Sequence, residues 1–361
     1  MPQAKEQSLV SIDIARAVAA LGVFYYHLHL GRVLRDYTGF EWLYYAEAFG
    51  AFYAVPLFFL ISGYCIHLSN IRHIRANEPL PIKKYYIRRL KRLYPPYIVA
   101  LAVSVAVGYL VVPKNYNLTP ANALVHIFLL QAYTERYFVA INVVLWTISV
   151  ELAFYLIYPV FYYLRRRFSL DVALVTIFIV SGISIALLSI FTDYSLPRSY
   201  FPINIWFAWC CGAYLADKVK LNPAVLKKPV YKIIYAGILV AFILFQVTGL
   251  SRFDIIGYQL KILVWTAPLV LLICAEPWLS RKRNFLVKIT AMIGLSSYSL
   301  YLLHEPLISL KNYCASKFLP HALQHAGIAI GIFLIPVITW FSYKYIEKPF
   351  MARKPEPVVN E

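Results

Sequence analysis

The chain has 361 residues and a formal net charge of +18 at pH 7; 61% of its residues are hydrophobic and only 14% are charged. Soluble globular domains and disordered chains contain fewer apolar and more charged residues, so this composition excludes both classes. Apolar stretches of about 20 residues, the length that crosses the hydrocarbon core of a bilayer, recur along the chain. The sequence therefore predicts an all-α, polytopic membrane protein.

Ten transmembrane helices are expected, at residues 9–30, 49–69, 94–112, 142–164, 168–191, 201–217, 231–250, 259–276, 291–311 and 323–343. No polar or Gly/Ser-rich stretch separates them into groups. We therefore expect one membrane domain over residues 1–361, with a core at 9–350 and a tail at 351–361.

The positive charge is distributed unevenly between the loops. If the N-terminus is cytoplasmic, 25 of the 35 Lys and Arg residues lie in cytoplasmic segments and 9 in extracytoplasmic ones. Such an excess is typical of cytoplasmic loops, so both termini and the tail are predicted to be cytoplasmic. The charge then indicates orientation in the lipid bilayer, and no nucleic-acid partner is expected. The five cysteines lack the spacing of a metal site, so no metal is expected either.

The first span contains ionisable side chains within apolar sequence. Arg16 and His27 are eleven residues apart, which on a helix places them about 20° apart in projection and about 16 Å apart along the axis. Asp13 lies one turn before Arg16 and can pair with it. An ionisable side chain at mid-membrane costs about 2.5–3.5 kcal/mol and needs a partner or a water-filled cavity. These residues are either a structural ion pair with a core histidine, or a functional face that connects the two sides.

The sequence "YYIRRLKRLYPPY" places basic side chains in the predicted cytoplasmic loop at 70–93, directly before the third span. Arg89 and Arg92 are three residues apart and would point to similar sides of a helix, with Arg88 beside them. Guanidinium groups bind phosphate through paired hydrogen bonds. The segment therefore either sets the orientation and contacts anionic lipid headgroups, or binds a phosphorylated ligand.

The connection at 113–141 contains "TPANALVHIFLLQAY", in which a Thr-Pro pair opens about three apolar helical turns. This helix is too short to cross the bilayer, and we expect it to be re-entrant or interfacial. Tyrosine and tryptophan side chains near span ends, such as those in "YLIYPVFYYL", are typical of the aromatic belt at a membrane surface.

The fourth span contains one carboxylate, Glu151, in "LWTISVELAFYLIYP". A carboxylate within the membrane needs a cationic or proton-sharing partner, and His27 and Arg16 have the right chemistry. The polar and aromatic residues nearby are Trp146, Thr147, Ser149 and Tyr155. In the ninth span, His304 and Glu305 follow several hydroxyls in "SSYSLYLLHEPL". They form either an interfacial polar pair before a proline or a catalytic pair.

These segments together resemble acyltransferase family 3, a family of integral membrane acyltransferases. The matching motifs are "IDIARAVAALGVFYYH", "FFLISGY", "RRLKRLYPPY", "LWTISVELAFYLIYP", "SYSLYLLHEPL" and "YIEKPF". They occur in the order of the family and cover nearly the whole chain. Tyr64 stands where the second-span motif usually has phenylalanine, and Ala17 where glycine is common.

The resemblance implies an O-acyltransferase that moves an acyl group, usually acetyl, from cytoplasmic acyl-CoA to a hydroxyl of a sugar or polysaccharide. The acceptor can be lipid-linked and is expected outside the cytoplasm, and the enzyme in the bacterial cytoplasmic (inner) membrane. No tightly bound cofactor is implied. Only eleven residues follow "YIEKPF", so we expect no C-terminal SGNH hydrolase-like domain. The alternative is a proton-coupled transporter or flippase of a glycan or small molecule, because ionisable side chains in spans also form such paths.

The resemblance also implies roles for the polar residues. His27 is the expected general base, or alternatively the nucleophile, and Glu151 would orient it. Arg16 would serve the thioester side. The phosphates of acyl-CoA would be bound by Arg88, Arg89 and Arg92. An oxyanion donor is expected in Ser149 or Tyr155. The full set of supporting positions is Asp13, Ser62, Trp146, Ser149, Tyr155 and His304.

Overall fold

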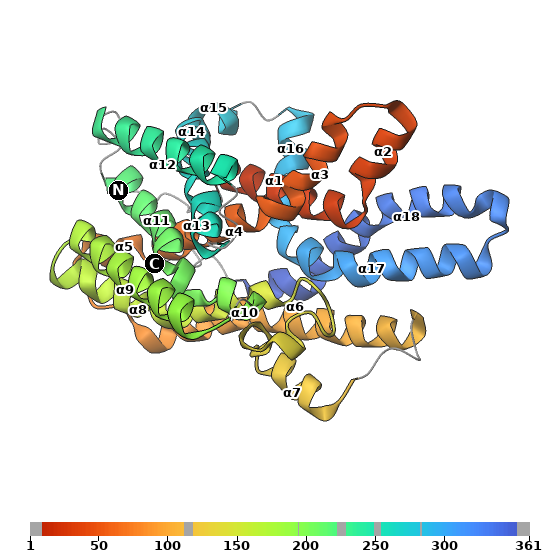
Figure 1. Cartoon of the computed structure of the whole chain (residues 1–361), viewed down its shortest axis with the longest axis horizontal. Helices are drawn as coiled ribbons and strands as arrows, with labels where there is room; N and C mark the ends of the chain where they lie inside the picture. The colour runs from red at the N-terminus through yellow and green to blue at the C-terminus, as the bar shows by residue number, and fades with distance from the viewer. Residues whose placement is uncertain are drawn as a thin grey trace, which may run out of the picture. The chain divides into compact units, whose positions relative to one another are not determined.

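The computed structural model describes residues 9–111, 118–193, 195–221, 229–248, 254–281 and 284–351 (Figure 1). Every regular element within these ranges is helical, so the predicted all-α fold is confirmed. The chain forms two compact units. The first contains Met1–Leu80 and Leu118–Ser297, and the second contains Pro81–Asn117 and Tyr298–Glu361. The expected single membrane domain stays a prediction.

The first unit contains most of the helices. They are α1 (Val10–His27), α2 (Leu30–Thr38), α3 (Trp42–Phe52), α4 (Ala54–Leu68), α5 (Ile71–Arg75), α7 (Pro120–Ile127), α8 (Trp146–Arg167), α9 (Leu170–Phe191), α10 (Leu196–Ser199), α11 (Pro202–Leu221), α12 (Pro229–Thr248), α13 (Asp254–Leu263), α14 (Thr266–Cys274), α15 (Glu276–Arg281) and α16 (Phe285–Leu295). The second unit contains α6 (Ile82–Val111), α17 (Ser297–Phe318) and α18 (His321–Ser342).

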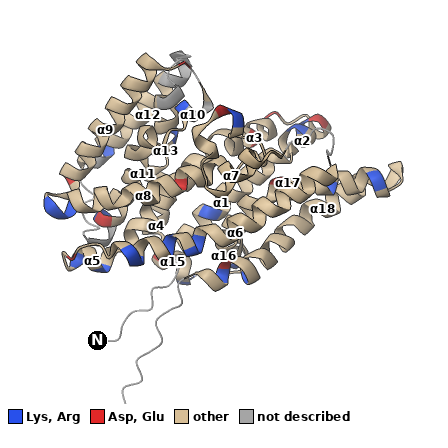
Figure 2. Ribbon diagram, turned by 90° about the horizontal axis from the view of Figure 1, so that it is seen from below, with Lys and Arg blue, Asp and Glu red and all other residues tan. Residues whose placement is uncertain are grey.

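Each of the ten predicted spans corresponds to a helix or a broken pair of helices. Within the described ranges, five helices are long and apolar enough to cross a membrane, or eight if each bent pair is one span. Two predicted spans are not among these helices: α11 contains buried polar residues such as Asn204 and Asp217, and the described part of α12 qualifies only as a shorter apolar helix, Lys232–Leu244. The end of the 231–250 span and nearly all of the 351–361 tail lie outside the described residues. Figure 2 shows how few charged residues interrupt the long helices.

The first predicted span ends in a sharp bend. α1 and α2 meet at 69°, and His29 between them has φ = 51°, in the left-handed region that non-glycine residues rarely occupy. α1 therefore ends at His27 rather than continuing to residue 30 as predicted. The polar end of the first span lies directly before the bend.

Two glycines allow α1 and α4 to approach their neighbours closely. A Cβ atom at Gly50 on α3 would lie 1.9 Å from the carbonyl oxygen of Gly22 on α1. A Cβ atom at Gly63 on α4 would lie 2.1 Å from the carbonyl oxygen of Trp209 on α11. Small residues at such crossings bring membrane helices into backbone contact. The glycine of the "FFLISGY" motif therefore fixes how α4 packs on α11.

Candidate active site

Arg16 links the first span to the second. Its Nη1 atom lies 3.5 Å from Oδ1 of Asp13, as the one-turn spacing predicts, and its Nη2 atom donates to Sγ of Cys65 on α4 at 3.3 Å. Asp13 is almost completely buried, whereas the Arg16 side chain keeps 19% of its surface exposed. The arrangement neutralises the carboxylate and leaves part of the guanidinium accessible.

His27 is oriented by its own helix. Its Nδ1 atom lies 3.0 Å from the carbonyl oxygen of Val23, one turn earlier. Because a carbonyl oxygen only accepts, the proton of the neutral imidazole must be on Nδ1, which makes Nε2 the basic nitrogen. The geometry fixes the tautomer that a general base requires.

Glu151 has partners that differ from those suggested by the sequence. It accepts a hydrogen bond from the hydroxyl of Ser62 on α4 at 3.1 Å and a short one from the hydroxyl of Tyr155, one turn later on α8. Both hydrogen bonds go to Oε1, from hydroxyl groups that can share a proton with the carboxylate. A pairing of Glu151 with His27 or Arg16 stays a prediction.

α4 connects these groups. Ser62 and Cys65 are three residues apart and lie on one side of the helix. Ser62 contacts Glu151 on α8, and Cys65 contacts Arg16 on α1. The structure therefore groups four predicted site residues around neighbouring positions of α4. Ser62 contacts Glu151, and Cys65 contacts Arg16, which pairs with Asp13.

The remaining candidates on α8 have structural partners. The hydroxyl of Ser149 donates a short hydrogen bond to the carbonyl oxygen of Leu129. Trp146 stacks on Phe138, with ring centroids 5.0 Å apart, and packs against Tyr200 at a tilted angle, with centroids 4.3 Å apart. The hydroxyl hydrogens of Ser149 and Tyr155 are thus directed at other acceptors, and neither side chain presents an oxyanion donor in this conformation.

The basic motif lies in the second unit and is helical. α6 begins at Ile82, so the motif belongs to the helix rather than to the predicted loop. The helix also continues through Pro95 and Pro96, and in that turn the carbonyl oxygen of Leu93 accepts a hydrogen bond from the Tyr298 hydroxyl at 2.9 Å. The motif residues are Arg88, Arg89 and Arg92.

Within the motif, the guanidinium of Arg89 lies 5.6 Å from the ring centroid of Tyr85, one turn earlier. Such a cation–π contact holds the guanidinium plane in a defined direction. Arg89 and Arg92 are three residues apart on this helix, as the sequence predicts.

His304 on α17 is also oriented by backbone. Its Nδ1 atom lies 2.7 Å from the carbonyl oxygen of Tyr301 and 3.1 Å from that of Leu300. As for His27, these contacts place the proton of the neutral ring on Nδ1. The structure therefore gives His304 the same tautomer as the candidate base, without assigning it a role.

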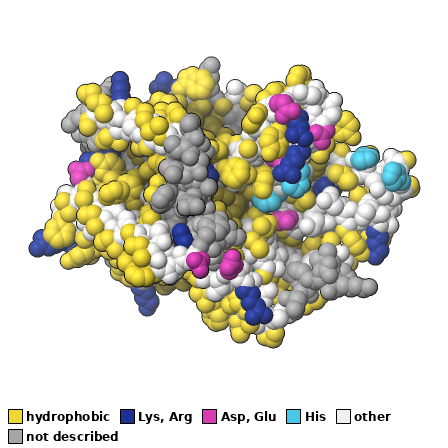
Figure 3. All heavy atoms as spheres, in the orientation of Figure 1, with side chains coloured by type: hydrophobic (Ala, Val, Ile, Leu, Met, Phe, Trp, Pro, Cys, Tyr) yellow, Lys and Arg dark blue, Asp and Glu magenta, His cyan; other side chains and the backbone are white. Residues whose placement is uncertain are grey.

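Two further carboxylates, Glu276 and Glu47, anchor α1 and α2. Glu276 on α15 accepts hydrogen bonds from the backbone N–H groups of Val10 at 3.0 Å and Ser11 at 2.7 Å, and so caps α1. Glu47 on α3 is buried, and its carboxylate contacts Arg32 Nε at 3.0 Å and His29 Nδ1 at 3.7 Å. Figure 3 shows charged and histidine side chains gathered over α2 and α3. No local sequence signal indicates either contact.

A comparison with known families decides the class of protein. The profile of the family described as "Acyltransferase domain" matches residues 9–344. The chain belongs to this acyltransferase family. It is similar to the proteins named "O-acetyltransferase OatA" of Staphylococcus aureus strains NCTC 8325 and COL, each 27% identical over 96% of the chain. The chain spans 57% of the length of these relatives. No solved structure matches it.

Proposed function

We propose that the protein is a membrane-embedded O-acyltransferase that moves an acyl group, in the first place acetyl, from cytoplasmic acyl-CoA to a hydroxyl of a sugar or polysaccharide outside the cytoplasm. The family assignment supports acyl transfer, and the names of the relatives support an O-acetyl product. The same assignment favours this function over the transporter that composition alone leaves open. The proposed location is the bacterial cytoplasmic membrane.

The contact between Nδ1 of His27 and the carbonyl oxygen of Val23 is the observation that carries the mechanism. With its proton on Nδ1, directed at Val23, the ring offers Nε2 to the acceptor hydroxyl. Nε2 removes the hydroxyl proton while the oxygen attacks the thioester carbonyl. The C–S bond then breaks, and the imidazolium returns the proton to the departing thiolate of CoA. His27 ends the cycle neutral, and no other reactant is consumed.

Arg16 acts on a different part of the donor. It lies about 16 Å from His27 along α1, so the two side chains cannot both contact one carbonyl carbon. The guanidinium of Arg16 contacts Asp13 and Cys65, and its side chain stays partly exposed. We assign it to the polar amide groups of the acyl-CoA arm, which would extend along α1 toward His27.

Glu151 serves to position hydroxyl groups. It holds the hydroxyls of Ser62 and Tyr155 at the contact between α4 and α8. Because His27 is oriented by Val23 instead, a carboxylate is not required behind the imidazole. We therefore assign Glu151 to the wall of the acyl-donor path rather than to a triad.

The phosphates of the donor are assigned to Arg88, Arg89 and Arg92. Paired guanidinium donors suit the diphosphate and 3′-phosphate groups of CoA. These groups cannot cross the bilayer, so they are expected at the cytoplasmic end of α6. That assignment agrees with the positive-inside orientation.

The test uses purified protein in liposomes, acetyl-CoA labelled in the acetyl group, and a mixture of bacterial cell-wall and capsular glycans. We expect label in carbohydrate that mild alkali releases as acetate, the behaviour of an O-acetyl ester. Alkali-resistant label would indicate N-acyl transfer. The absence of both transfer and acetyl-CoA binding would contradict the proposal.

A further inference from the structure

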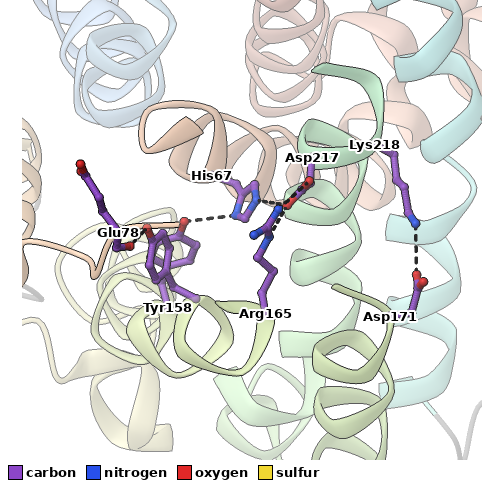
Figure 4. Close-up of polar contacts among 8 residues, drawn as sticks. His67, Glu78, Tyr158, Arg165, Asp171, Asp217 and Lys218 are labelled. Atoms are coloured by element: carbon purple, nitrogen blue, oxygen red, sulfur yellow. Dashed lines mark hydrogen bonds and ion pairs between the residues drawn. The ribbon is translucent and has the colours of Figure 1, made fainter. Parts of the chain in front are cut away.

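A buried polar cluster joins α4, α8 and α11 within the first unit (Figure 4). His67 on α4 is completely buried, and its Nε2 atom lies 3.0 Å from Oδ2 of Asp217 on α11. Its Nδ1 atom lies 3.1 Å from the hydroxyl of Tyr158 on α8. Arg165, two turns later on α8, donates from Nε to the same Asp217 oxygen at 2.8 Å.

The cluster can be satisfied without net charge. Asp217 only accepts, so Nε2 of His67 donates to it and Nδ1 accepts from the Tyr158 hydroxyl. The negative charge of Asp217 is balanced by Arg165, and His67 stays neutral. A fully paired buried network of this kind holds its helices in one arrangement, since any displacement leaves a buried polar group unpaired.

The cluster lies on the same helix pair as the Glu151 contact. α4 and α8 are joined at Ser62–Glu151 and again at His67–Tyr158. The two contacts are five residues apart on α4 and seven on α8, in the same order, so the helices run parallel. His67 is also two residues from Cys65, which contacts Arg16. The His67 contact on α4 therefore lies within five residues of the two α4 residues that contact the candidate site, Ser62 and Cys65.

We propose that His67 is a positioning residue for the acyl-transfer site. Through Tyr158 and Asp217 it fixes the rotation and axial position of α4. The Ser62 hydroxyl then remains hydrogen-bonded to Glu151, and the Cys65 sulfur remains in contact with Arg16. This inference rests on the proposed function, because the effect of a displaced α4 is measured as a lower rate of acyl transfer.

α8 provides a matched pair of variants. Tyr158→Phe removes the hydroxyl that contacts His67 and keeps the ring. Tyr162→Phe, one turn later, removes a hydroxyl that donates to the carbonyl oxygen of Glu78 at 2.7 Å, outside the cluster. Both changes remove one hydrogen bond from a buried tyrosine, so their effects on stability should be similar.

The expected result is a difference in rate rather than in stability. For folded protein isolated by size-exclusion chromatography, Tyr158→Phe should lower kcat about tenfold, because small displacements of positioned groups strongly slow reactions. KM for acetyl-CoA should stay within about twofold, and Tyr162→Phe should leave kcat near the wild-type value. Equal kcat values for the two variants would overturn the proposal.

A double-mutant cycle separates positioning from a general structural effect. If His67 acts through Ser62, adding Tyr158→Phe to Ser62→Ala should lower kcat by less than about twofold further. Independent, multiplied losses would overturn the inference while leaving the proposed function intact. If the wild-type protein transfers no acyl group, the proposed function fails and this inference fails with it.

Discussion

The imidazole of His27 is held by its own backbone. The Nδ1 contact with Val23 is within one helix, so it forms whenever α1 forms. Glu151, by contrast, is held by Ser62 on another helix and by Tyr155 on its own. The orientation of His27, the proposed base, therefore depends on local structure, whereas the arrangement around the carboxylate of Glu151 depends on how the helices pack.

Arg89 is the proposed phosphate contact that a single substitution tests most directly. Arg89→Ala should raise the dissociation constant for acetyl-CoA at least about tenfold, since a hydrogen bond to a charged group contributes about 1.5–3 kcal/mol. Arg89→Lys should have an intermediate effect, because it keeps the charge but loses the planar fork. Isothermal titration calorimetry measures both.

Lys83→Ala is the control for Arg89. It removes one positive charge from an exposed position at the start of the same helix. An equal loss of affinity in Lys83→Ala and Arg89→Ala would indicate a general effect of charge. Unchanged affinity in Arg89→Ala would remove Arg89 from the donor site.

Glu276 caps the N-terminus of α1 and so affects the stability of the whole helix. The carboxylate accepts two backbone N–H groups that the helix cannot pair itself. Burial alone would raise the pKa of Glu276, but hydrogen bonds from Ser11, Ser280 and Val10 more than offset it, so the pKa lies below its ordinary value. The helix that carries Arg16 and His27 is therefore stabilised by an ionised carboxylate.

Glu276→Gln should destabilise the protein by about 1 kcal/mol at pH 7, the usual value of an N-terminal cap. A lowered folded-state pKa means that this stabilisation is complete above the unfolded-state pKa, about 4.3, and is lost as pH falls through the folded-state value. The Tm difference between wild type and variant should therefore shrink between pH 6 and pH 3.

Glu135→Gln is the control, because Glu135 is exposed. Its Tm should follow that of the wild type at every pH. Thermal unfolding in detergent, monitored by tryptophan fluorescence, measures all three proteins. A Tm difference for Glu276→Gln that is constant with pH would show that the charge of Glu276 does not stabilise α1.

The positions of the helices were predictable from the sequence where local hydrophobicity determines where a helix begins and ends. The long apolar helices α8 and α9 follow the predicted spans within a few residues. The sequence "YLIYPVFYYL" was predicted to belong to the aromatic belt, yet Tyr158 and Tyr162 are buried. Hydropathy shows that a tyrosine lies near a span end, but the neighbouring helix decides whether its ring faces lipid or protein.

The orientation in the membrane is a prediction about the whole molecule. Lys84, on the predicted cytoplasmic side, and Arg136, on the predicted outer side, are both exposed. In a cysteine-free background, Arg136→Cys should react with a membrane-impermeant maleimide on intact cells. Lys84→Cys should react only after permeabilisation. The reverse pattern would contradict the positive-inside orientation.

The candidate site could be predicted only where its contacts are local. The pair of Asp13 and Arg16 follows from one helical turn. The contact between Ser62 and Glu151 joins residues 89 positions apart, and that between His67 and Asp217 joins residues 150 positions apart. No spacing rule indicates such contacts, because they depend on which helices pack together.

A comparison of two histidines with the same backbone contact tests the role of His27 in acyl transfer. In both His27 and His126, Nδ1 contacts the backbone carbonyl oxygen of the residue one helical turn earlier. The distances are 3.0 Å for His27 and 2.9 Å for His126. In the liposome assay, His27→Gln should lower acetyl transfer to glycan at least about 100-fold, and His126→Gln by less than about threefold. Transfer by folded His27→Gln at the wild-type rate would contradict the proposed mechanism.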